Sequence, residues 1–188
     1  MEEISKKNNK KVRLSKLENY LLYFFIYAFL GWFFETLYAI YTHGHFVKRG
    51  FLFGPICPIY GYGALILLIF LRGYQKSSIK LFFISAIVFS ALEYVVSFAM
   101  EGAFMAHWWD YTDSFFNLNG RISIAYSFVW GIAAILFINH LHPFIKRNLN
   151  KRIIKNIPVA IQSLIIKITF FIYSIDTVLS WIAHAPGK

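Results

Sequence analysis

The sequence predicts an all-α membrane protein, a bundle of about five transmembrane helices whose second helix is broken at its Gly/Pro-rich start. The chain has 188 residues, of which 58% are hydrophobic and only 15% are charged. A soluble domain is typically about a quarter charged. The apolar residues also fall in long runs, and a bilayer core requires about 20 mostly apolar residues per helix. Composition and patterning therefore indicate one membrane domain.

Five apolar runs are long enough to be considered as spans. They cover Tyr20–Tyr41, Phe53–Leu71, Ile79–Gly102, Ser123–Pro143 and Ile157–Ile182. The first is too long for the apolar region of a signal peptide and is followed by no small-x-small cleavage site, so it reads as an uncleaved anchor. The predicted divisions are a basic cytoplasmic tail (1–19), a four-helix core (20–143), a basic cytoplasmic loop (144–156), and a fifth helix with a short outer tail (157–188).

The basic residues predict the orientation, because cytoplasmic loops carry the excess of Lys and Arg. With the N-terminus inside, the cytoplasmic side holds Lys6, Lys7, Lys10, Lys11, Arg13, Lys16, Arg72, Lys76, Lys80, Lys146, Arg147, Lys151, Arg152 and Lys155. The outer side holds only Lys48, Arg49, Arg121 and Lys188. This placement at the ends of apolar runs explains the net charge of +10 without a nucleic-acid partner.

The fifth run is the weakest span because it contains Lys167 and Asp176. An alternative has four spans followed by an amphipathic helix on the cytoplasmic surface. The length and apolar content of the run favour the five-span interpretation.

Three carboxylates, Glu35, Glu93 and Asp176, fall within apolar runs. A charged group at the centre of a membrane helix costs about 2.5–3.5 kcal/mol on insertion scales, so such groups face a protein interior or a watery cavity. Glu35 and Glu93 both lie roughly 22 Å from the cytoplasmic ends of their runs at 1.5 Å per residue. The predicted polar cavity is lined by Glu35, Glu93, Glu101, Arg121 and Asp176, with Arg121 as a counter-ion at its outer mouth. The alternative is an ion-pair network that only locks the bundle.

The segment Phe51–Gly63 reads FLFGPICPIYGYG. Its prolines lack amide donors and restrict the residues before them. We expect Gly54–Gly61 to be non-helical and packed in protein, since irregular backbone at membrane depth is tolerated only there or beside a cavity. The alternative is that Pro simply begins a helix at the interface.

The segment His107–Arg121 reads HWWDYTDSFFNLNGR and suits an outer loop at the interface that folds back over the bundle as a lid.

His43, His45 and His107 with Asp110 match no strong metal motif, so no metal site is predicted. The single Cys57 excludes an internal disulfide. The chain contains no phosphate-binding G-x-x-x-x-G-K-[ST] motif, so it is not itself an NTPase, and nothing in it points to a cofactor.

Several motifs occur in a characteristic order: RGFLFGPICPIYGYG, LEYVVSFAMEG, WWDY, and NLNGRIS followed by Trp-Gly. In these motifs the chain resembles the putative ABC-transporter type IV (CmpB-like) family, over about Gly31 to Gly131. The fifth run lies outside the clear resemblance. The motif positions carried over are Glu35, Arg49, Gly54, Pro55, Pro58, Gly61, Glu93, Glu101, Trp109, Asp110, Asn117, Asn119, Gly120 and Arg121.

The resemblance implies a permease-like protein of the bacterial cytoplasmic membrane. Because this chain carries no ATPase domain, such a role would require a separate ATPase subunit at its cytoplasmic loops. Three functions stay open: a transport component with a polar cavity, an intramembrane enzyme acting on a lipid or isoprenoid head group, and an accessory subunit without a site of its own. Beyond the lipid bilayer, a homo-oligomeric state and an ATPase partner are both compatible with the sequence.

Overall fold

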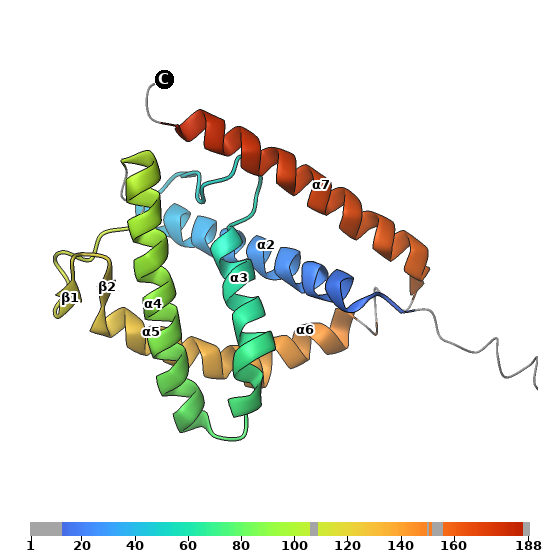
Figure 1. The fold of residues 1–188 in the computed structure, drawn as a ribbon, viewed down its shortest axis with the longest axis horizontal. Coiled ribbons are helices and arrows are strands. Elements are labelled where there is room, and N and C mark those ends of the chain that lie inside the picture. The colour runs from blue at the N-terminus through green and yellow to red at the C-terminus, as the bar shows by residue number, and fades with distance from the viewer. Residues whose placement is uncertain (1–12, 106–108, 150, 152–155, 186–188) are drawn as a thin grey trace, which may run out of the picture.

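The computed structural model describes residues 13–105, 109–149, 151 and 156–185, and within them the chain is helical apart from loops and one small hairpin (Figure 1). The elements are α2 (Lys16–His43), α3 (Pro58–Ile66) with its extensions η1 (Leu67–Leu71) and η2 (Arg72–Tyr74), α4 (Ser78–Phe104), β1 (Asn117–Leu118), β2 (Ile122–Ser123), α5 (Ile124–Leu136), η3 (Phe137–Leu141), α6 (His142–Asn148) and α7 (Val159–His184). Four helical runs, Lys16–His43, Ser78–Phe104, Ile124–Asn148 and Val159–His184, are long and apolar enough to cross a membrane, and Pro58–Tyr74 is a shorter apolar helix. The all-α membrane fold class is thus confirmed.

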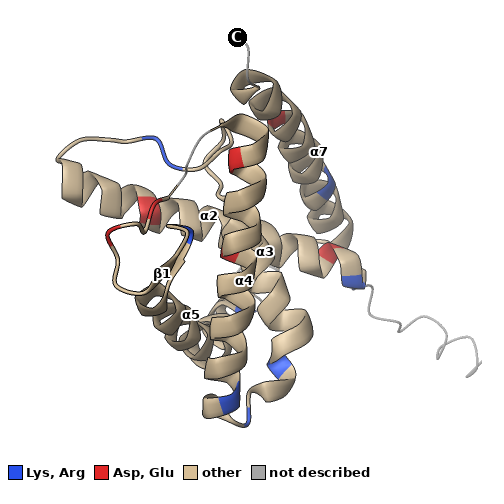
Figure 2. Cartoon of the chain, turned by 60° about the vertical axis from the view of Figure 1, so that its left-hand side comes forward, with Lys and Arg blue, Asp and Glu red and all other residues tan. Residues whose placement is uncertain are grey.

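The helix ends sort into two sides. In Figure 1 the first residues of α2 and α7, the end of α6 and the connection between α3 and α4 lie toward the bottom and right. The ends of α2, α4 and α7 and the beginnings of α3 and α5 lie toward the top and left. Figure 2 shows Lys and Arg at the α3–α4 connection and near the beginning of α2. The sides that the sequence assigns to cytoplasm and exterior therefore correspond to two ends of the bundle.

Helix α2 has strong boundary signals at both ends. Ser15 caps its beginning: its hydroxyl accepts from the Glu18 amide at 3.2 Å, and the Glu18 carboxylate accepts from the Ser15 amide at 2.8 Å. This reciprocal pair satisfies amides that would otherwise lack partners. Gly44 ends the helix in the left-handed region at φ 74°, where glycine carries no steric penalty.

The Gly/Pro segment is non-helical only as far as Cys57. Leu52 and Cys57 are buried, and the Cys57 amide donates to the Ala28 carbonyl of α2 at 3.0 Å, so this backbone is packed in protein. Helix α3 begins at Pro58, and Gly61 is therefore helical, so the expected non-helical stretch through Gly61 is wrong in its second half. The reason is that Pro58 occupies the first turn, where a missing amide costs nothing.

The fourth apolar run does not end at Pro143. Helix α5 passes through the π-helical η3 into α6 and continues to Asn148. Pro143 cannot donate the usual amide bond, and a wider helical turn immediately before it accommodates the ring without breaking the helix.

Helix α7 lies alongside α2 (Figure 1). Near its beginning, Lys167 Nζ lies 4.0 Å from Glu18 Oε1 and Ser163 donates to the same carboxylate. Near its end, Asp176 binds the backbone of the segment that precedes α3. Helix α7 thus contacts the beginning of α2 and, further along, the segment before α3, which favours a span for α7 over a helix lying on the cytoplasmic surface.

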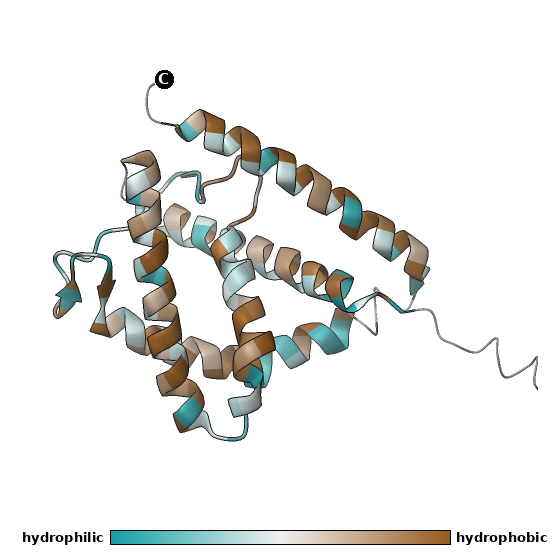
Figure 3. Cartoon of the chain, in the orientation of Figure 1, coloured by the Kyte–Doolittle hydropathy of each residue, from teal (hydrophilic) through white to brown (hydrophobic). Residues whose placement is uncertain are grey.

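The core is small and depends on glycine. Leu67, Leu71, Leu81, Phe89, Ala134 and Ile138 form one buried cluster among α3–η1, α4 and α5–η3. A Cβ on Gly61 would lie 2.6 Å from the Phe24 ring, and one on Gly131 would lie 2.6 Å from the Phe82 ring. Small residues thus allow the helices to approach closely, as in membrane bundles. Figure 3 shows apolar residues over most of the helical surface, as expected for elements that face lipid.

Candidate functional site

Glu93 lies on the buried face of α4 and is 6% exposed. Its carboxylate accepts a hydrogen bond from the Tyr111 hydroxyl at 2.8 Å and another from Trp130 Nε1 at 3.0 Å. Tyr111 belongs to the outer loop and Trp130 to α5. One carboxylate therefore joins α4, α5 and the loop through neutral donors.

Tyr111 is a residue of the loop that contacts both a carboxylate of α4 and a ring of α5. Its ring stacks on Tyr126 at 4.4 Å between centroids. Burial raises the pKa of Tyr111 above its ordinary value, and the hydrogen bond to Glu93 and the negative charges of Glu93 and Glu35 raise that pKa further. Tyr111 consequently stays protonated and acts as the donor to Glu93.

Glu35, on α2, has a separate set of donors. The Tyr60 hydroxyl donates to it at 2.8 Å, and Cys57 Sγ lies 3.5 Å from its other oxygen. Tyr60 belongs to α3, and its ring packs against Gly31 of α2, where a Cβ would lie 2.2 Å from the ring. Arg49 interacts electrostatically with both Cys57 and Tyr60. Glu35 thus links α2 to the segment and helix that follow it.

The sequence predicts Arg121 as a counter-ion near Glu35 and Glu93. In the structure its partner is another carboxylate. Arg121 forms an ion pair with Glu101, near the end of α4, and lies over the rings of Tyr94 and Phe98 at 5.8 and 5.7 Å. The charge of Glu101 raises the pKa of Arg121 through this contact. Glu101 lies eight residues beyond Glu93, or about 12 Å along the helix. Within the described residues, no Lys or Arg forms an ion pair with Glu35, Glu93 or Asp176.

Asp176 binds backbone instead of a cation. Its two oxygens accept from the amides of Phe53 at 3.0 Å and Gly54 at 2.9 Å, and Ser180 donates to it at 3.2 Å. A Cβ on Gly54 would lie 2.9 Å from the carboxylate, so glycine is what allows this approach. Because Pro55 follows directly, these amides have no helical partners of their own, and α7 supplies the acceptor.

The described part of the outer loop, from Trp109, is held by its own polar residues. Trp109 Nε1 donates to the Arg121 carbonyl at 3.1 Å, and Asp110 accepts from the Thr112 amide at 2.8 Å. The Asn117 side chain donates to the Thr112 carbonyl at 2.9 Å and accepts from the Gly120 amide at 3.0 Å. Asn119 and Gly120, at φ 54° and 67°, turn the chain between β1 and β2, which pair antiparallel.

This loop is also attached to α4. The Asn119 side chain donates to the Tyr94 hydroxyl at 3.0 Å, which adds to the Tyr111–Glu93 bond. The loop residues selected from the sequence are therefore mainly those that shape the loop. Arg121, which pairs with Glu101, is a site residue predicted from the sequence. Tyr111, which donates to Glu93, and Tyr94, which accepts from Asn119, are not. Their aromatic character suggested only the membrane interface, and nothing in their spacing identified their partners.

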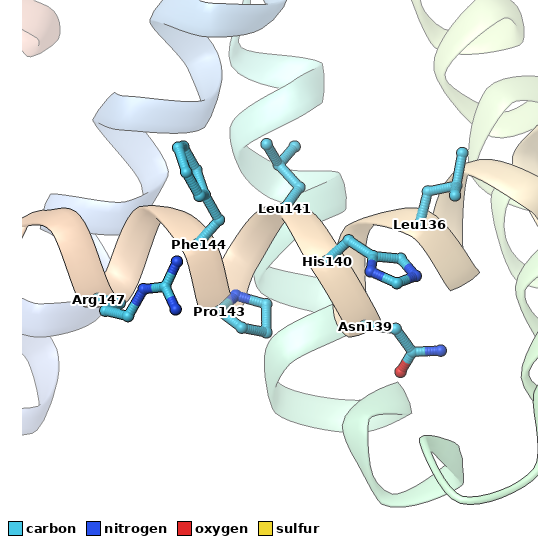
Figure 4. A pocket seen from close by; sticks show the side chains of 7 residues that line it. All are labelled: Leu136, Asn139, His140, Leu141, Pro143, Phe144 and Arg147. Atoms are coloured by element: carbon cyan, nitrogen blue, oxygen red, sulfur yellow. The ribbon is translucent and has the colours of Figure 1, made fainter.

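Two shallow grooves lie on the surface. One, of about 480 Å³, lies between α4 and α5 beneath the hairpin and includes Ser90, Tyr94, Leu118 and Ser127. The other, of about 610 Å³, runs along η3 and α6 (Figure 4). Among the described residues no group of three His, Cys, Asp or Glu side chains is arranged to hold a metal ion. His107 lies outside the described residues, and the rings of His43 and His45 are 6.2 Å apart.

Apolar helices that carry buried carboxylates, joined by an outer loop hydrogen-bonded into the bundle, define a helical membrane protein with a polar interior. Over residues 22–181 the chain matches the family described as "Putative ABC-transporter type IV", and it belongs to that family. No curated protein and no solved structure matches the chain. The family resemblance is confirmed, and it extends beyond Gly131 through most of α7, which corrects the expectation that the fifth run lies outside it.

Proposed function

We propose that the protein is the membrane component of a transporter, multi-pass in a bacterial cytoplasmic membrane with its N-terminus inside. The observation that carries the proposal is the pair of carboxylates, Glu35 and Glu93, each bound by neutral donors within apolar helices. Intramembrane carboxylates of this kind mark substrate and ion pathways. The membership of the chain in this family supports a separate ATPase subunit as the energy source.

The chemistry of these groups favours a cationic or hydrogen-bond-donating solute. Glu35 and Glu93 offer carboxyl oxygens, and among the described residues neither has a cationic partner. A passing cation would supply such a partner, because the donors already present are hydroxyl, thiol and indole groups. Tyr111 closes the site from the outer side and would move with the loop to admit the solute.

Water access along α4 tests this function. We would place single cysteines at Ser97, one turn beyond Glu93, and at Ser85, two turns before it, in a Cys57→Ala background. Both serines are buried, at 8% and 0% exposure. A transport pathway predicts that a membrane-impermeant thiol reagent labels Ser97→Cys in intact cells and Ser85→Cys in inverted vesicles. Ile87→Cys, on the outward face of α4, is the control and should stay unlabelled in lipid.

The accessory-subunit reading predicts no labelling at either serine position, with labelling only after denaturation. That result would overturn the transport proposal, because a pathway must admit water from each side at some point in the cycle.

One observation favours a second function, an intramembrane enzyme that acts on a lipid or isoprenoid head group. The groove between α4 and α5 opens toward lipid and contains Tyr94, over which Arg121 lies. Arg121 could hold a phosphate there by its planar set of donors. Glu93 does not line this groove. Hydrolysis of a polyprenyl phosphate by the purified protein, lost in Arg121→Gln, would support this function over transport.

A further inference from the structure

The groove along η3 and α6 combines charge with apolar surface on one helical run. Its lining is Leu136, Asn139, His140, Leu141, Pro143, Phe144 and Arg147. Figure 4 shows that Arg147 and Phe144 lie at one end, and Asn139 and His140 toward the other. In Figure 4 Phe144, Leu141 and Leu136 project to the upper side of the ribbon, and Arg147 and Asn139 project to the lower side. The groove therefore offers hydrogen-bond donors beside an apolar strip.

Depth places these groups at a membrane boundary. A hydrocarbon core of about 30 Å corresponds to about 20 helical residues. Counted from Ile124, that length ends near Phe144. Arg147 then lies about one turn outside the hydrocarbon, among the head groups, and His140 about one turn inside it. Leu141 lies at about the depth of His140 and Leu136 about one turn deeper, both at the level of acyl chains, and they are exposed at 42% and 55%.

The charge of the groove is uncompensated. Arg147 and Lys146 are both exposed, and within the described residues neither forms an ion pair. Basic residues just outside a membrane helix attract anionic lipids at about 1 kcal/mol each, and a basic groove beside a helix can bind one head group specifically. The guanidinium of Arg147 can bind a phosphate through two parallel hydrogen bonds, whereas the ammonium of Lys146 acts as a point charge.

We propose that this groove binds the head group of an anionic phospholipid. The phosphate lies against Arg147, and one acyl chain follows Phe144, Leu141 and Leu136 toward the membrane interior. Assignment of the lipid to the inner leaflet rests on the topology in the proposed function. Recognition of the head group by the groove is independent of that topology.

The test uses the full-length protein in phosphatidylcholine nanodiscs containing increasing phosphatidylglycerol, with bound lipid counted by native mass spectrometry. The expected result is preferential retention of phosphatidylglycerol. Arg147→Ala should weaken it at least tenfold, because this variant loses the hydrogen bonds to the phosphate. Arg147→Gln is a second variant with a smaller change in volume. Lys146→Ala is the matched control: it removes the neighbouring exposed charge outside the groove and should weaken retention by no more than about fivefold, the factor for losing one basic residue at a membrane surface.

Equal losses in Lys146→Ala and Arg147→Ala would overturn the proposal, because they would indicate unspecific attraction to a charged surface. Equal retention of phosphatidylcholine and phosphatidylglycerol by the native protein would also overturn it. Soluble glycerol 3-phosphate, added in a third arm, should not displace the lipid. Displacement would identify a phosphate site without an acyl-chain requirement, which contradicts a lipid site. None of these outcomes depends on transport activity.

Discussion

The hydroxyl of Tyr111 donates to the carboxylate of Glu93 at 2.8 Å, so the outer loop is fastened to the middle of α4. A hydrogen bond to a charged, buried acceptor contributes about 1.5–3 kcal/mol. We expect Tyr111→Phe to lower the free energy of unfolding in detergent by about that amount and to increase proteolysis of the loop. Tyr126→Phe is the control, because it keeps the stacked rings and leaves the bond to Glu93 in place. Equal effects of both variants would argue against the fastening.

The partner of Arg121 can be identified by rescue. Arg121 forms an ion pair with Glu101. If this pair matters, Arg121→Ala leaves Glu101 without its cation, and adding Glu101→Gln should recover part of the lost thermal stability. Glu93→Gln should give no such recovery. A double-mutant cycle on the melting temperature measures both couplings, and a larger coupling to Glu93 would contradict the structure.

Asp176 should control the order of the segment before α3. Asp176→Ala removes the acceptor of the Gly54 amide and one of two acceptors of the Phe53 amide, which also donates to Ser180 at 3.2 Å; a buried donor left without a partner costs about 1–3 kcal/mol. We therefore expect Cys57, which is buried, to react faster with a thiol reagent in Asp176→Ala. Asp176→Asn keeps one acceptor and should react at an intermediate rate. Ser174→Ala, on the same helix, should react like the native protein.

Two helical glycines should respond in opposite directions to the same substitution. A Cβ on Gly61 would lie 2.6 Å from the Phe24 ring and 2.9 Å from its carbonyl oxygen, so Gly61→Ala should destabilise the protein by about 1–3 kcal/mol. A Cβ on Gly102 meets nothing within 4 Å, and Gly102→Ala should be neutral or stabilising by up to about 1 kcal/mol. Membrane insertion should be unchanged in both, because it depends on span hydrophobicity. Loss of insertion in Gly61→Ala would assign this glycine to an earlier step of folding.

The proposed topology has a simple readout. A reporter that is active only outside the cytoplasm, fused after Lys188, should be active if the spans number five and the N-terminus is inside. Activity of the same reporter inserted in the connection between α3 and α4 is the control and should be absent. A cytoplasmic C-terminus would remove α7 from the spans.

The sequence alone determined the class of protein and the residues that cannot face lipid. Runs of about 20 apolar residues have few structures open to them in a bilayer, and a carboxylate within such a run must turn inward, so both conclusions follow from local composition. The interruption at Gly54 and Pro55 is likewise a property of a short segment. The continuation through Pro143 was missed because a wider turn absorbs a proline without any mark in the sequence.

Only the tertiary structure decided which donor each carboxylate accepts from. Glu93 is bound by Tyr111 and Trp130, Asp176 by two backbone amides, and Arg121 pairs with Glu101. Depth along a helix predicts that Glu35 and Glu93 lie at one level, but the choice of partner depends on how far helices rotate and approach, and glycines such as Gly31 and Gly61 set that approach. The energies of competing polar contacts differ by only one or two kcal/mol, so packing, and not residue type, selects among them.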